Sequence, residues 1–302
     1  MVDTENFISK NMDYDTLCSE IRKLQKRYPF LSCCSIGKSL LGRNIFCLTL
    51  GNPQNSILFA GAFHGMEWIT SVLLLNFAQD LCYAEENHLS LYTIPIYTAL
   101  KRHGICIIPC VNPDGVEISL HGALSAGGYA PLVLEVSQGD TLHWQSNARG
   151  VDINHNFNAD WFTLHRLECA SGICGPSPTR YGGTAPESEP ETASIAAYCR
   201  HKAFRYVIAF HSQGEEIYYN YGEKTPPKAI RMAERFSYWS GYQLAVPEGL
   251  ASMGGFKDWF IDYFNRPGFT IEVGFGKNPL PLNDIKSIYP KLREMMVRAI
   301  IL

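Results

Sequence analysis

Apolar residues recur at helical spacing in three stretches of the chain. The first stretch is Asp13–Tyr28, which Pro29 terminates, and the second is Trp68–Ala84. A third helix is predicted over Glu187–His201, directly after Pro186. Apolar positions three and four residues apart lie on one face of a helix, and proline commonly marks a helix boundary. The chain is therefore predicted to contain several long helices that bury one face.

Short, continuous apolar runs predict buried strands between these helices. The runs are Ser56–Phe63, Gly104–Val111, Tyr206–Phe210 and Phe269–Val273. The segments CCSIGKS and NIFCLTLG predict two further strands around a turn at Gly42-Arg43. Buried strands that alternate with helices indicate a sheet covered on both faces. The predicted fold class is α/β: a three-layer α/β/α arrangement with a mainly parallel or mixed twisted central sheet.

The middle of the chain lacks this regular alternation. The sequence NPDG at Asn112–Gly115 is predicted to be a turn that closes the preceding strand, and His121–Arg149 is predicted to form long loops. No repeat, low-complexity tract or Pro/Ser-rich linker divides the sequence. We therefore expect one catalytic domain over residues 1–302, a length that can bury a large core.

The composition disfavours several classes of partner. The formal net charge is −3 and no long basic run occurs, so we expect neither nucleic acid nor an anionic membrane as a partner. Apolar stretches such as Ser71–Ala78 are too short to span a bilayer. The opening residues are acidic and contain no apolar run, so no secretory signal is expected.

The chain contains ten cysteines. Without a secretory signal, they predict reduced thiols and a cytoplasmic location, with a spore compartment as a second possibility. Cys169 and Cys174 flank a Gly-containing loop and could instead form a disulfide or a metal pair. We favour free thiols, because two cysteines do not complete a zinc tetrad.

Three polar side chains follow buried strands and suggest a metal site. His64 and Glu67 come directly after the strand SILFAGAF, and His211 comes after the strand RYVIAF. In open α/β sheets, ligands bind at the carboxyl ends of the strands. Two histidines and one glutamate form a catalytic zinc set that leaves a fourth position for water. The H-x-x-E spacing alone carries little weight, because nine histidines make a chance match common.

The full set of motifs resembles the zinc carboxypeptidase family from about Tyr14 to the C-terminal region. In the family's order these motifs are HGMEW, NPDG, GVDIN at Gly150–Asn154, Pro186–Thr192, His211 after a strand, and a glutamate in FTIEVG. The resemblance implies one Zn²⁺ per chain, held by His64, Glu67 and His211.

The resemblance also implies catalytic roles for two further residues. Glu272 matches the family's catalytic base, which takes a proton from the attacking water. The alternative, a buried glutamate without a function, would be costly in an apolar strand. Arg149 resembles the arginine that stabilises the oxyanion. The alternative for Arg149 is a solvated arginine on a loop.

The sequence departs from the digestive carboxypeptidases at three places. Asn154-His155 stands where those enzymes have Asn-Arg, and a histidine cannot reproduce the bidentate fork that clamps a carboxylate. Leu250 stands at the position of their mobile tyrosine, and Met66 replaces an arginine between the first two ligands. These changes argue against release of ordinary C-terminal residues.

The stretch from Gly254 to Pro281 resembles the bacterial branch that cleaves γ-D-glutamyl–diaminopimelate bonds of peptidoglycan peptides. Lys257 falls at the position that lines the specificity pocket in that family. A cation there suits the spare carboxylates of a murein peptide, with Asn154 and His155 as further contacts. The alternative is that Lys257 simply points to solvent, as most lysines do.

The expected partner is therefore a murein peptide, and the expected reaction is hydrolysis by zinc-activated water. An ordinary metallocarboxypeptidase or an N-acyl amino acid deacylase on the same fold is the alternative. A non-catalytic zinc or peptide-binding module is a third interpretation, which the intact ligand set and Glu272 disfavour. The aromatic stretch Tyr218–Tyr221 could line a substrate groove, but we expect most of it to lie in the core.

Overall fold

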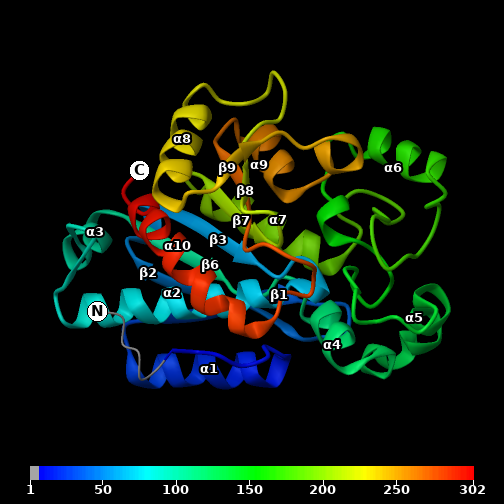
Figure 1. Ribbon diagram of the computed structural model, residues 1–302, viewed down its shortest axis with the longest axis horizontal. Helices are drawn as coiled ribbons and strands as arrows, with labels where there is room; N and C mark the ends of the chain where they lie inside the picture. The colour runs from blue at the N-terminus through cyan, green and yellow to red at the C-terminus, as the bar shows by residue number, and fades with distance from the viewer. Residues whose placement is uncertain (1–6) are drawn as a thin grey trace.

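An eight-stranded mixed sheet runs through the computed structural model, which describes residues 7–302 (Figure 1). The strand order across the sheet is β1-β2-β6-β3-β7-β10-β8-β9. The strands are β1 Ser32–Lys38, β2 Asn44–Gly51, β3 Ser56–Gly61, β6 Gly104–Ile108, β7 Val207–His211, β8 Glu216–Tyr218, β9 Gln243–Ala245 and β10 Gly268–Glu272. A small separate hairpin pairs β4 Ser90–Leu91 with β5 Ile94–Pro95.

The four central strands, β6, β3, β7 and β10, are parallel. On one side, β1 pairs antiparallel with β2, and β2 pairs antiparallel with β6. On the other side, β8 pairs antiparallel with β10 and parallel with β9. All six residues of β3 are buried, as the continuous apolar run predicts for a strand covered on both faces.

Ten α-helices surround the sheet in the described part of the chain. They are α1 Tyr14–Arg27, α2 Ile69–Glu86, α3 Ile96–Arg102, α4 Pro113–His121, α5 Ala130–Ser137, α6 Trp161–Ala170, α7 Pro190–Lys202, α8 Lys228–Ser240, α9 Phe256–Phe264 and α10 Ile285–Ala299. Short 3₁₀ turns lie at Pro53–Asn55, Gly65–Glu67, Ala123–Tyr129, Ile153–His155, Gly249–Ser252 and Leu282–Asp284.

The helices form two layers with the sheet between them. On one face α2, α8 and α10 pack together and share a core with β3, where the rings of Phe59 and Phe77 lie 5.7 Å apart. On the other face α7 and α9 cover a second core that contains Phe157 and Trp259. The predicted three-layer α/β/α class is confirmed.

Local sequence signals explain where the first helix begins and ends. The side chain of Asp13 accepts a hydrogen bond from the backbone N–H of Thr16 (2.8 Å), which satisfies one of the free donors at the start of α1. The helix ends before Pro29. Its buried face consists of Leu17, Ile21 and Leu24 together with Glu20.

Two predictions about the segment between β6 and β7 were wrong. Residues 112–115 are not a separate turn, because Asn112 caps α4 by accepting the N–H of Gly115 (2.9 Å). His121–Arg149 is not all loop, since it contains a 3₁₀ turn and α5. The helices α4 and α5 are short and have their C-caps at Gly122 and Gln138, so their periodicity is weak in the sequence.

All ten cysteines are free thiols. The thiol of Cys174 donates a hydrogen bond to the backbone oxygen of Cys169 (3.5 Å). The two cysteines do not form a disulfide. Residues 1–6, on which part of the prediction about a secretory signal rests, lie outside the described residues. Within residues 7–302, no helix combines the length and hydropathy needed to cross a membrane.

Candidate metal centre and active site

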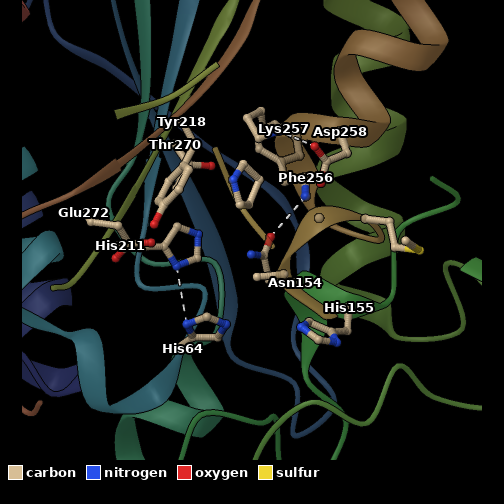
Figure 2. A pocket seen from close by; sticks show the side chains of 14 residues that line it. His64, Asn154, His155, His211, Tyr218, Phe256, Lys257, Asp258, Thr270 and Glu272 are labelled. Carbon is tan, nitrogen blue, oxygen red and sulfur yellow. Dashed lines mark hydrogen bonds and ion pairs between the residues drawn. The ribbon is translucent and has the colours of Figure 1, made fainter. Parts of the chain in front are cut away.

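The ends of three neighbouring parallel strands bring the candidate catalytic side chains together. His64 lies three residues after β3, His211 is the last residue of β7, and Glu272 is the last residue of β10. Glu272 and His211 are direct partners in the pairing of β10 with β7. Figure 2 shows His64, His211 and Glu272 on one side of a cavity.

Nitrogen and oxygen atoms of three residues face one another at this edge of the sheet. The Nδ1 atom of His64 lies 2.9 Å from Glu67 Oε1, and the Nδ1 atom of His211 lies 3.0 Å from Glu67 Oε2. The two Nδ1 atoms are 3.3 Å apart. Converging lone pairs of this kind need a shared proton or a cation between them. Among the described residues, this is the one group of three with the spacing of a metal site.

Mutual charge shifts the pKa values within this cluster. Burial opposes the charged form of His64, but the carboxylates of Glu67 and Asp152 outweigh it and raise the pKa of His64. Burial would raise the pKa of Glu67, yet His64 and His211 hold it at about 2. Burial lowers the pKa of His211. Glu67 is therefore an anion over the whole physiological range, as a metal ligand must be.

Asp152 supports the ring of His64 from behind. Its Oδ1 lies 3.2 Å from His64 Nε2, and its carboxylate also accepts the backbone N–H groups of Asn154 (3.1 Å) and Arg180 (2.9 Å). A carboxylate on the second ring nitrogen fixes the orientation of a metal-binding histidine. We assigned no role to Asp152 from the sequence, although it belongs to the GVDIN motif.

The cavity beside this cluster has a volume of about 170 Å³. It is lined by His64, Asn154, His155, His211, Tyr218, Pro247, Ala251, Met253, Gly255, Phe256, Lys257, Asp258, Thr270 and Glu272. Burial and the charge of Glu67 raise the pKa of Glu272 well above its ordinary value. A carboxyl group in this setting binds a proton more tightly than a solvated glutamate does.

The opposite wall of the cavity comes from the start of α9 (Figure 2). Lys257 is only 4% exposed, so the interpretation that it points to solvent is wrong. Its ammonium group donates to the backbone oxygen of Asn220 (2.7 Å) and forms a buried ion pair with Asp258. Burial raises the pKa of Asp258. This wall thus presents a cation that is already paired.

Asn154 and His155 lie in the cavity wall beside this helix. The Oδ1 atom of Asn154 accepts the backbone N–H of Phe256 (3.0 Å), which joins the 3₁₀ turn at Ile153–His155 to the start of α9. His155 is largely buried, and its Nδ1 contacts the carboxylate of Glu168 at 2.8 Å.

The structure does not bring Arg149 into the cavity. Its guanidinium lies 3.5 Å from Glu189 Oε1, and 41% of its side chain is exposed. It is absent from the residues that line the cavity. The predicted oxyanion role of Arg149 therefore gains no support from its position.

A model of the zinc carboxypeptidase family matches residues 17–296. The chain belongs to the zinc carboxypeptidase family. It is accordingly a zinc metallopeptidase, and its His–Glu–His cluster is a donor set that suits the metal on which the family depends.

Relatives and solved structures agree with this assignment. The chain is 36% identical to gamma-D-glutamyl-L-diamino acid endopeptidase 1 from Lysinibacillus sphaericus, over 93% of this chain and 70% of that protein. It also resembles the structure of bovine thrombin-activatable fibrinolysis inhibitor, with a TM-score of 0.73, 21% identity and 96% of both chains covered. Murein-tripeptide amidase from Escherichia coli O157 has a TM-score of 0.57 at 21% identity, over 90% of this chain and 92% of that chain. The two structural likenesses show the fold.

Tyr218 and Thr270 line the cavity, and the sequence did not single them out as site residues. We expected most of Tyr218–Tyr221 in the core, and this holds for Tyr219 and Tyr221. Tyr218 instead donates its hydroxyl to Glu216, and burial raises its pKa. Side chains alternate between the two faces of a strand, and β8 pairs with β10. This alternation is the sequence signal that could have placed Tyr218 in the cavity wall.

Proposed function

We propose that this zinc metallopeptidase hydrolyses the γ-D-glutamyl–diaminopimelate amide bond of murein peptides. The proposed substrate is supported by the 36% identity, over nearly the whole chain, to a protein named as a γ-D-glutamyl diamino acid endopeptidase. The proposed hydrolytic reaction is supported by the position of Glu272 in the same cavity as the His–Glu–His cluster.

In this proposal His64, Glu67 and His211 hold the zinc ion. When bound, zinc supplies a Lewis acid that polarises the scissile carbonyl and acidifies water. Asp152 keeps the ring of His64 in one orientation. Glu272 takes the proton of the attacking water and delivers it to the nitrogen of the leaving amine. Its raised pKa lets it carry that proton between the two steps.

In this proposal, the substrate is recognised by the cavity wall that contains Asn154, His155 and Lys257. A murein peptide carries carboxylates on the D-glutamate and on both ends of diaminopimelate, so it offers acceptors to these donors. The pairing of Lys257 with Asp258 makes this wall suited to a substrate that is itself zwitterionic. Arg149 has no part in this scheme, because its guanidinium contacts Glu189.

The expected location remains a prediction from the sequence. A cytoplasmic or spore-compartment enzyme would meet released murein peptides more readily than intact wall. This expectation rests on the cysteine content of the sequence.

Incubation of the zinc-loaded protein with L-Ala-γ-D-Glu-diaminopimelate, followed by mass spectrometry, tests the proposal. We expect release of diaminopimelate that a chelator abolishes and added zinc restores. A hippuryl amino acid and an N-acyl amino acid serve as comparison substrates. Cleavage of these, with the murein peptide left intact, would replace the proposal by carboxypeptidase or deacylase chemistry. Binding without cleavage of any of them would indicate a non-catalytic module.

A further inference from the structure

A second cavity lies at the edge of the sheet opposite the hydrolytic centre. It has a volume of about 320 Å³, and Arg205, Arg266 and Lys228 line it together with Gln54 and Tyr206. No aspartate or glutamate side chain is among its lining residues. Within residues 7–302, no carboxylate forms an ion pair with any of the three cations. This cavity therefore concentrates positive charge, whereas the cavity at the metal cluster contains charges of both signs.

Strand register places the two arginines at the same edge of the sheet. Val207 and Gly268 are direct partners at the start of the parallel strands β7 and β10. Arg205 and Arg266 each lie two residues before these partners, so the backbone brings both side chains to one end of the strands. Six residues along the chain, His211 lies roughly 20 Å from Arg205 at about 3.3 Å per residue. The basic cavity is therefore separate from the hydrolytic centre.

Backbone carbonyl groups hold both guanidinium groups in place. Arg266 Nη1 donates to the backbone oxygen atoms of Ala203 and Phe204, the latter at 2.6 Å. Arg205 Nη2 donates to the backbone oxygen of Ile300 (2.6 Å), directly after α10. A guanidinium group has five N–H donors, so each arginine keeps donors for a further partner. Because a carbonyl group is neutral, these contacts orient the two cations without neutralising their charge.

The protein supplies too few acceptors for the guanidinium group of Arg205. Its Nε atom is buried and makes no hydrogen bond to the described part of the chain. A buried donor without a partner costs roughly 1–3 kcal/mol. Burial lowers the pKa of Arg205, and the pKa of nearby His103 is lowered by burial with the charges of Arg205 and Arg102 added. An anion beside these groups would offset the accumulated positive charge.

We propose that this cavity binds the phosphate group of a small molecule between Arg205, Arg266 and Lys228. Arginine donates two parallel hydrogen bonds to a phosphate, and lysine contributes a point charge. Lys228 is the exposed first residue of α8, which packs against α10 beside the cavity (Figure 1). A phosphate group carries nearly two negative charges at neutral pH, so it matches three cations better than a single carboxylate does. The proposal is independent of the peptidase substrate.

Calorimetric titration with inorganic phosphate at low ionic strength tests the proposal. Because phosphate can also bind zinc, the zinc-loaded protein and the metal-stripped protein are titrated in parallel. We expect one phosphate per chain to bind without the metal, and to bind at least about 10-fold more tightly than acetate, which carries a single charge. Absence of phosphate binding to the metal-stripped wild type, or equal affinity for acetate, would overturn the proposal.

Single substitutions test whether these cations hold the phosphate. Arg205→Gln and Arg266→Gln should each raise Kd for phosphate about 10- to 100-fold, the range for a hydrogen bond to a charged group. Lys228→Gln, at an exposed position, should raise Kd about 2- to 5-fold. Lys286→Gln is the matched control and should leave Kd unchanged, because Lys286 lies at the start of α10 and the cavity lies at its end.

Lys228→Glu keeps the test independent of folding. The two arginines bond the backbone, so their replacement can also weaken the fold, whereas Lys228 is exposed. Lys228→Glu should weaken phosphate binding more than Lys228→Gln does and should leave the unfolding temperature without phosphate unchanged. An affinity that is unchanged in Lys228→Glu and in both arginine variants would overturn the proposal. Pyrophosphate distinguishes the source: tighter binding than that of phosphate supports a diphosphate group, and equal binding supports a single phosphate.

Discussion

Glu272 lies directly opposite His211, with the two residues ending the parallel neighbours β10 and β7. A one-residue slip in either strand would turn one of the two side chains to the other face of the sheet. The buried apolar residues of both strands therefore fix the register that places a carboxyl group beside the metal cluster.

Replacement of Glu272 tests its role as the base. We expect Glu272→Gln to lower kcat by about 10²- to 10⁴-fold, the usual contribution of a general base. The bound zinc and KM should change little. Glu215→Gln is the matched control, because Glu215 pairs with Lys291 away from the cavity lining. Full activity of Glu272→Gln, measured by product release, would exclude the mechanism.

Asp152→Asn should weaken zinc binding by about 10- to 100-fold, because the variant loses the anion that supports the ring of His64. Competition with a chromogenic chelator measures the affinity directly. Asp140→Asn, at an exposed carboxylate that contacts His143, is the control for the change of charge. An unchanged affinity in Asp152→Asn would mean that the contact with His64 does not tune the site.

Lys257→Met should destabilise the protein by about 3–5 kcal/mol, because it leaves the buried carboxylate of Asp258 without its partner. Urea unfolding of the chelated protein measures the free energy. The double variant with Asp258→Asn should recover much of the loss, since the unpaired charge is then absent. Equal stability of the single and double variants would show that the two residues are not coupled.

Buried Glu191 predicts a pH dependence of stability. Burial, with the charge of Asp114 added, raises its pKa to about 7, against about 4.5 in an unfolded chain. The folded state therefore binds the proton more tightly. The free energy of unfolding should fall as pH rises from about 4.5 to 7, by on the order of 3 kcal/mol from this group.

Glu191→Gln should remove this contribution to the pH dependence of the free energy of unfolding, because the glutamine stays neutral at every pH. Urea unfolding of both proteins at pH 5 and pH 8 gives the comparison. Relative to the wild type, the free energy of unfolding of the variant should be higher at pH 8 than at pH 5. A difference that is the same at both pH values would contradict the assignment.

The sequence predicted that the candidate metal ligands and Glu272 lie close together, because strand ends determine where these side chains lie. His64, His211 and Glu272 each follow a short, mostly apolar run, and such runs become adjacent buried strands in an α/β sheet. The positions of these side chains then depend only on strand order and register. The periodicity of α1 and α2 was equally clear, and both helices lie within two residues of their predicted bounds.

The recognition wall was harder to predict because it depends on irregular structure. His155 and Glu168 meet only because a 3₁₀ turn and α6 are folded against each other, and no periodicity encodes that contact. Arg149 was assigned by its place beside a motif, yet its guanidinium turns to Glu189. Lys257 is buried against Asp258, a contact that hydropathy alone does not reveal.

The long excursion between β6 and β7, residues 109–206, carries Asn154, His155 and Glu168. In contrast, His211 and Glu272 are the last residues of two strands, and His64 follows a third. The sheet positions are bound by strand pairing on both sides, but the excursion packs partly around its own small core with Trp144 at its centre. Substitutions at Asn154 or His155 therefore change the wall of the cavity, whereas Asp152 of the same excursion contacts the ring of His64. Because Asn154 and His155 lie outside the strands, we expect a change of amide substrate to require substitutions in the excursion and not in the sheet.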